Sequence, residues 1–212
     1  MTHDTDNAPL SGQADIAWLR QLAEENGTAP MRGASILLAA GVIYGLTSLL
    51  HWAHITGLIA PRLVGSGLEW LIATGLFLIA NVLLVLRLRR GAGVRTAGQR
   101  VVATVWAGVG CGIFFLFASM LAVSLRIGAD QNGLIFWMVP SIIMVFYGLG
   151  WSVTATMLKS RPLWILGVTS FLAAPALGAL SGQPAQYLGY AAALFLLMAL
   201  PGFLLMRQSK SA

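Results

Sequence analysis

The sequence predicts an all-α fold: a polytopic membrane bundle of six transmembrane helices, with both termini cytoplasmic and a short amphipathic helix in front. Of the 212 residues, 58% are hydrophobic and only 9% are charged, and the mean hydropathy is +0.80. Soluble domains carry about 25% charged residues, and disordered chains are more polar still. The composition therefore excludes both classes and indicates a membrane protein.

Apolar runs place the six helices in order along the chain. A helix needs about 20 apolar residues to cross a bilayer, so six of them with short turns leave no room for a soluble catalytic domain. The runs form a membrane domain over residues 33–206, followed by a short cytoplasmic tail. They cover residues 33–55, 64–87, 101–125, 134–158, 162–180 and 185–206.

Proline and turn residues support these boundaries. Pro162 begins a run at the helix position where a missing N–H costs nothing, and residues 181–184 read Ser-Gly-Gln-Pro, a turn cluster. Pro140, Pro175 and Pro201 fall inside runs and predict kinked or interrupted helices.

Residues 1–32 are polar and acidic, so they do not read as a signal peptide, which begins with a basic segment. The first apolar run is then a retained span. Between residues 13 and 25 an amphipathic helix is predicted, whose net acidic polar face favours a protein partner over anionic lipid. A loosely ordered tail is the alternative. The apolar face of this helix holds Ile16, Leu19, Leu22 and Ala23.

Basic residues orient the bundle. Cytoplasmic loops carry the Lys and Arg excess of membrane proteins, and the basic connectors all fall on one side if both termini are cytoplasmic. The connector between the second and third spans has five basic residues and no acidic one: Arg87, Arg89, Arg90, Arg95 and Arg100. The other basic residues on that side are Lys159, Arg161, Arg207 and Lys210.

This charge pattern also bears on partners and location. The net charge of +6 reports topology, so no nucleic-acid partner is expected. The five arginines between 87 and 100 are expected to contact anionic lipid headgroups. We expect an integral protein of a cell membrane, the bacterial inner membrane.

Ionisable side chains within the spans supply the one candidate site. Glu69 is the only carboxylate well inside a run, and His51 and His54 end the preceding run at the same predicted depth. Arg126 closes the third run on that side. A polar cluster of these four is predicted, with three interpretations left open: interfacial anchors, a structural Glu69–Arg126 pair, or a proton or divalent-metal site on the histidines and Glu69.

Small and amide side chains predict helix packing. Gly41 and Gly45, and likewise Gly108 and Gly112, have the small-xxx-small spacing that lets backbones approach closely, within the bundle or in a homo-oligomer. Asn81 is expected to hydrogen-bond a neighbouring helix.

Catalytic signatures are absent from the sequence. It has no Gly-x-Ser-x-Gly elbow, no His-Glu-x-x-His and no Walker A loop. Cys111 is alone, and Lys159 and Lys210 lie outside the runs. No enzyme activity and no cofactor are therefore expected, apart from the divalent metal considered above.

Three function classes follow. The short loops and scarce buried polar residues favour a non-enzymatic accessory or regulatory membrane protein that acts through partner binding. The alternatives are a small oligomeric transporter or channel, and a metal- or haem-binding membrane sensor or enzyme using His51, His54 and Glu69.

Overall fold

In the computed structural model the chain divides into two units, Met1–Pro30 and Met31–Ala212. In the first unit Ile16 alone is described; it is helical and its side chain is 67% exposed. The rest of the predicted 13–25 helix lies outside the described residues. The structure describes residues 16, 33–59, 67–90, 97–127 and 133–211.

Six apolar helices in the described ranges are long enough to span a membrane, and these ranges contain no strand. This confirms the predicted all-α, six-helix fold class. The first five are α2 (Ala34–Ile55), α3 (Leu68–Arg90), α4 (Ala97–Ile127), α5 (Gly133–Met157) and α6 (Arg161–Ala179). The sixth is a continuous rod of α7 (Ala185–Leu194), the π-helical turn η2 (Phe195–Ala199) and α8 (Leu200–Ser211).

Helix α4 extends beyond its predicted bounds. It begins at Ala97 and not at residue 101. The apolar run stops at Arg100, but a helix needs no apolar side chains once it leaves the hydrocarbon, so the backbone continues for another turn. Hydropathy therefore locates the membrane-embedded part of a helix better than its ends.

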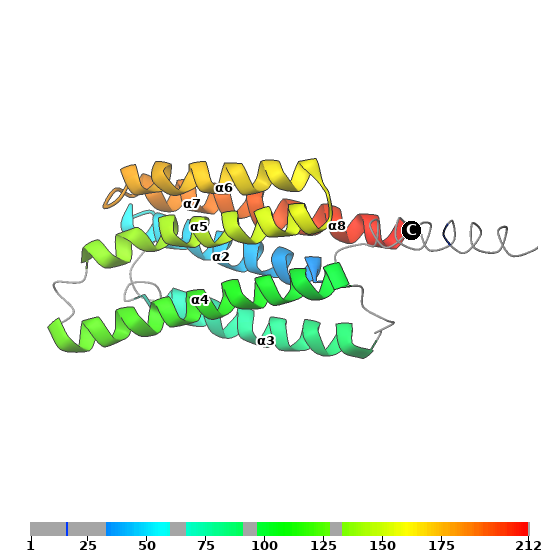
Figure 1. Ribbon diagram of the computed structural model, residues 1–212. Coiled ribbons are helices and arrows are strands. Elements are labelled where there is room, and N and C mark those ends of the chain that lie inside the picture. The colour runs from blue at the N-terminus through cyan, green and yellow to red at the C-terminus, as the bar shows by residue number, and fades with distance from the viewer. Residues whose placement is uncertain (1–15, 17–32, 60–66, 91–96, 128–132, 212) are drawn as a thin grey trace, which may run out of the picture. The chain divides into compact units, whose positions relative to one another are not determined.

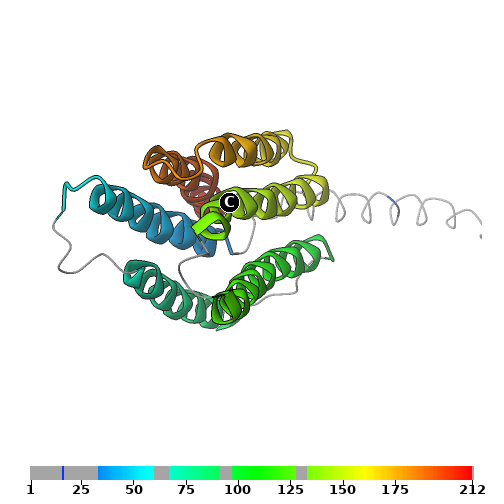
Figure 2. The same ribbon diagram turned by 90° about the vertical axis from the view of Figure 1, so that its left-hand side faces the viewer.

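Consecutive spans run antiparallel to one another (Figure 1). An inner group is formed by α2, α5, α6 and the α7–η2–α8 rod, whereas α3 packs against α2 and α4 packs against α5 (Figure 2). In the most apolar part of α5, 50% of the residues are buried, compared with 6% in α3 and 11% in α4. The side chains of α3 and α4 thus mostly face outward, as apolar side chains can where lipid is the solvent.

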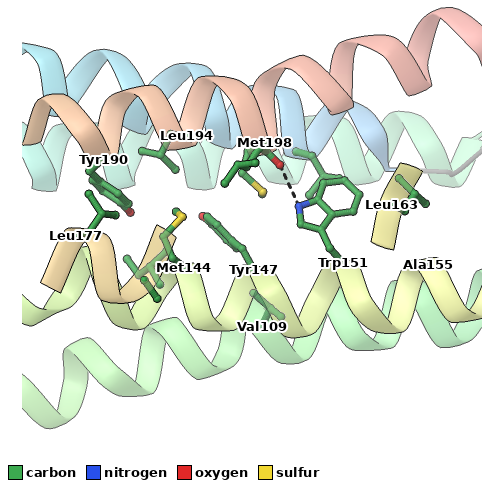
Figure 3. Packing of buried hydrophobic residues seen from close by; sticks show 14 of the residues in the cluster. Val109, Met144, Tyr147, Trp151, Ala155, Leu163, Leu177, Tyr190, Leu194 and Met198 are labelled. Carbon is green, nitrogen blue, oxygen red and sulfur yellow. Dashed lines mark hydrogen bonds between the residues drawn. The ribbon is translucent and has the colours of Figure 1, made fainter. Parts of the chain in front are cut away.

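The core lies between α5 and the last span (Figure 3). Trp151 and Met144 of α5 are 0% exposed, and Leu194 and Met198 of the last span are 0% and 1% exposed. Lipid tails are as apolar as these side chains, so their contribution comes from close packing more than from escape from water. The inner group is therefore closely packed where α5 meets the last span.

Proline explains the polar contact within that core. Pro201 has no N–H and cannot bond the carbonyl four residues earlier, which belongs to Leu197. The indole Nε1 of Trp151 donates to that Leu197 carbonyl at 3.0 Å (Figure 3). The π-helical turn lies in the same segment, so a buried tryptophan satisfies the backbone where the helix is irregular.

A buried amide side chain also bonds the backbone of two helices. Nε2 of Gln186, which is 0% exposed, donates to the carbonyls of Trp137 at 2.6 Å and Leu177 at 3.2 Å. Trp137 lies in α5, and Leu177 lies in the last turn of α6, where its carbonyl also accepts from the Leu180 N–H at 3.2 Å. One side chain of α7 thus holds α5 and α6 together.

Two glycines allow backbone contact between α2 and the last span. A Cβ on Gly41 would lie 2.4 Å from the backbone nitrogen of Ala199, and one on Gly202 would lie 2.6 Å from that of Leu38. No side chain fits at these distances, so the two helices touch through their backbones.

Candidate functional site: a histidine–glutamate pair where three helices meet

The candidate site is a contact between His51, near the end of α2, and Glu69, in the first turn of α3. Nδ1 of His51 lies 2.6 Å from Oε1 of Glu69. The antiparallel α2–α3 hairpin explains this proximity, because the last turns of α2 lie beside the first turns of α3. The side chain of His51 is 19% exposed and that of Glu69 is 6% exposed, so the carboxyl group is almost sealed.

The position of Glu69 in its helix favours a negative charge. Glu69 is the acidic residue of the first turn of α3, where the unpaired backbone N–H groups give a helix a partial positive charge. It is also the only acidic side chain within the described ranges. The α2–α3 hairpin thus presents one carboxyl group to one imidazole.

Aromatic rings surround the pair on one side. The ring of Tyr187, from α7, meets the His51 ring edge-on with centroids 4.3 Å apart, and Trp70 of α3 lies 5.9 Å from His51. One turn earlier in α2, Oγ of Ser48 donates to the Tyr187 carbonyl at 2.7 Å. The pair therefore lies at a junction of α2, α3 and α7.

The geometry allows more than one proton arrangement. A neutral or a protonated imidazole can donate from Nδ1 to the carboxylate, and a protonated carboxyl group can donate to a bare Nδ1. The doubly charged arrangement gives the strongest contact, because charge-assisted hydrogen bonds are about twice as strong as neutral ones. The contact between α2 and α3 thus depends on where protons reside.

Four buried polar atoms lack hydrogen-bond partners among the described residues, and two of them belong to the α2–α3 hairpin: Oε2 of Glu69 and Nδ1 of His54, besides Oγ of Ser141 and Oε1 of Gln186. An unsatisfied buried group carries a desolvation penalty of about 1–3 kcal/mol, and more when it is charged. The pair is therefore incompletely satisfied, which distinguishes it from the fully bonded Trp151–Leu197 contact.

Arg126 does not join the pair. It lies in the last turn of α4 with an exposed side chain, and the ion pair found for Glu69 within the described ranges is with His51. Nor do those ranges hold a group of three or more His, Cys, Asp or Glu side chains that could bind a metal ion. The structure thus brings two of the four predicted residues into contact, fewer than the three protein ligands typical of zinc.

The predicted packing residues separate into two groups. Gly41 and Gly45 face the last span closely, since a Cβ on Gly45 would lie 2.9 Å from the Phe195 ring. A Cβ added to Gly112 would lie 3.1 Å from the Phe146 ring, whereas one added to Gly108 would meet nothing within 4 Å. Asn81 is only partly buried, and within the described residues its amide has no hydrogen-bond partner.

The opposite end of the bundle is basic. Helix ends α3, α4 and α8 and the α5–α6 turn meet there (Figure 1), and no acidic side chain of the described ranges lies at that end. We call it the basic end. Its described basic side chains are Arg87, Arg100, Lys159, Arg161 and Arg207.

Sequence reasoning missed Ser48, Trp70 and Tyr187. The predicted topology placed the start of the last span at the same end as His51, so it offered a signal for Tyr187. It gave no signal for which faces of α2 and α7 meet, which depends on the backbone contact at Gly41.

The fold and the site define a class. Six apolar helices without a soluble domain in the described ranges form the architecture of a multi-pass membrane protein. Comparison of the chain with known protein families, curated proteins and solved structures finds no match.

Proposed function

We propose that this chain is a non-enzymatic regulatory membrane protein that acts through partner binding, with the His51–Glu69 pair as its proton-responsive contact. The observation that carries this proposal is the position of the pair. It joins α3, a helix that otherwise exposes most of its surface, to the inner group at α2.

The buried polar groups favour binding over transport by a single copy. Several hydroxyl groups in the inner helices donate to carbonyls of their own helix, and Ser48 donates to the Tyr187 carbonyl of α7. The bonds within one helix are Thr47 to Ile43, Thr154 to Gly150 and Ser170 to Leu166. Such hydroxyls do not line a polar path, and the core between α5 and the last span is filled with large side chains.

The proton response follows from the charges at the pair. The contact is tightest when the imidazole is protonated and the carboxyl group is ionised. Histidine is the side-chain type whose unperturbed charge change falls between about pH 5 and pH 8, so a contact between an imidazole and a carboxyl group is suited to respond to protons in that range. In the described residues, the titratable groups around Glu69 are His51 and Tyr187, with His54 one turn away on α2.

The basic end is proposed to be cytoplasmic and to contact anionic lipid. Each basic residue near an anionic surface contributes about 1 kcal/mol of attraction. The pair then lies toward the opposite face of the membrane, which is periplasmic if the membrane is a bacterial inner membrane.

The test is native mass spectrometry of complexes released directly from membranes at about pH 6 and about pH 8. We expect the wild-type chain to carry a second protein whose occupancy differs between the two pH values. Glu69→Gln, which keeps the shape and an acceptor oxygen, should abolish that difference. Ser119→Ala is the matched control, because Ser119 is exposed on α4 and bonds its own helix.

Two results would contradict the proposal in different ways. A wild-type chain without a bound protein at either pH would overturn the regulatory role. A pH difference that persists in Glu69→Gln would leave partner binding in place and remove the pair from it.

A further inference from the structure

Asn81 is a polar side chain that the described structure leaves without a bond. It lies near the middle of the α3 span, is partly exposed, and its amide has no hydrogen-bond partner among the described residues. Thr74, the other polar residue of this part of α3, donates to the Trp70 carbonyl of its own helix and accepts from the Tyr44 hydroxyl of α2 at 3.4 Å, at the edge of the α2 contact. Lipid tails offer an amide no hydrogen bond, so an open Asn81 is disfavoured in the bilayer.

Asn81 belongs to a stripe along one flank of α3. Residues spaced alternately three and four positions apart share a helix face, and this stripe lies beside the α2 contact, where Ala73 is 2% exposed. Leu71 and Leu78 of the stripe are 71% and 55% exposed. The stripe, called the Asn81 seam below, consists of Leu71, Thr74, Leu78, Asn81, Val85 and Leu88.

We propose that the Asn81 seam binds the same seam of a second copy of this chain, forming a dimer about a two-fold axis along the membrane normal. Copies of one membrane protein insert with the same orientation, so such an axis brings equal depths together. A residue near a two-fold axis then meets itself.

The chemistry of Asn81 suits this occupant. An amide carries both donors and an acceptor, so two identical amides complete each other's bonds. The seam has the three-four spacing of a helix–helix interface, in which a single buried asparagine fixes register. A different protein would need its own polar group at this depth, and lipid would leave both amides open. The dimer does not depend on the regulatory role proposed above, because Asn81 and Glu69 are separate groups on α3.

Cysteine cross-linking in native membranes tests whether the Asn81 seam is the face of α3 that meets the second copy. In a Cys111→Ser background, Leu78→Cys places a thiol in the seam, whereas Ile79→Cys places one on the far side of α3 at a similar exposure of 62%. Oxidation should join two copies through residue 78 and not through residue 79. Cross-linking at 79 alone, or a 78 adduct with the mass of another protein, would overturn the proposal.

The dimer dissociation constant tests whether the Asn81 amide contributes to the contact between the two copies. Asn81→Leu, which favours insertion into lipid, should raise the dimer dissociation constant roughly three- to thirtyfold, the range expected for hydrogen bonds between membrane helices. Asn81→Gln should retain most of the affinity. Single-molecule photobleaching in vesicles at graded protein density measures this. A wild-type chain that stays monomeric at every density, or an Asn81→Leu variant with unchanged affinity, would refute the dimer.

Discussion

Single residues in the core bond backbone carbonyls of neighbouring helices. Trp151 reaches from α5 to the Leu197 carbonyl, whose usual donor position is occupied by Pro201, and Gln186 reaches from α7 to the Trp137 carbonyl of α5. In a membrane this matters more than in a soluble domain, because no water is present in the hydrocarbon to bond a free carbonyl. Each contact therefore joins two helices.

Trp151→Phe should destabilise the folded chain by about 1–3 kcal/mol, because it removes the indole N–H and leaves the Leu197 carbonyl unsatisfied. Trp164→Phe is the control, since Trp164 lies on α6 with 47% of its side chain exposed. Equilibrium unfolding in detergent measures both free energies. Equal values for the two variants would mean that the indole bond adds nothing.

For single residues, the sequence predicted part of the candidate site. The ends of the apolar runs placed His51 and Glu69 at one depth, and the structure puts them 2.6 Å apart. The runs put Arg126 at that depth too, yet its side chain is exposed and unpaired with Glu69 in the described structure. Hydropathy predicts how deep a residue lies in the membrane. Which helix faces contact each other depends on side-chain packing, and no periodic pattern in a single sequence reveals it.

Helices of this bundle differ in how much each relies on its neighbours. Helix α2 touches the last span through backbone at Gly41, whereas α4 leaves Gly108 in open space. Both glycines have a second glycine four residues on, so the sequence pattern treats them alike. The difference arises because α2 is in the inner group and α4 is at its edge.

Alanine at these two glycines should have opposite effects. Gly108→Ala should stabilise the fold by up to about 1 kcal/mol, because alanine is the better helix former and nothing obstructs its methyl group. Gly41→Ala should destabilise it by about 1–3 kcal/mol or more, since the added carbon would push α2 away from Ala199. The same unfolding assay ranks them, and a stabilising Gly41→Ala would disprove the backbone contact.

The six spans themselves were predictable because each needs a long apolar run, and that requirement is local. The π-helical turn was not, because Phe195–Ala199 reads as ordinary apolar helix. Its geometry arises where Pro201, the Trp151 bond and the α2 contact coincide. Local signals thus placed the elements, and their irregularities came from tertiary contacts.

Charged side chains are distributed unevenly between the two ends of the helix bundle. The basic end gathers the described side chains of Arg87, Arg100, Lys159, Arg161 and Arg207, and the other end holds the His51–Glu69 pair and Arg126. By the positive-inside rule, this asymmetry predicts the orientation proposed above, with the basic end in the cytoplasm.

Cysteines at Gln99 and Gln183, in a Cys111→Ser background, should therefore react with impermeant reagents from opposite sides of the membrane. Gln99 lies in the first turn of α4 near the basic end, and Gln183 lies in the turn between α6 and α7. Labelling in right-side-out and inverted vesicles reads the orientation directly. Reaction of both from the same side would be incompatible with six spans.

The bond from Trp151 to Leu197 also bears on the order in which the chain is made. Chains emerge from the N-terminus, so α5 is already in the bilayer when the last span arrives. The last span brings a carbonyl whose usual donor four residues on is replaced by Pro201, and the indole that bonds this carbonyl is already present in an earlier helix. The final insertion event is thereby tied to the docking of helices already delivered, and a chain truncated before Leu197 would leave that indole N–H without its acceptor in the apolar interior.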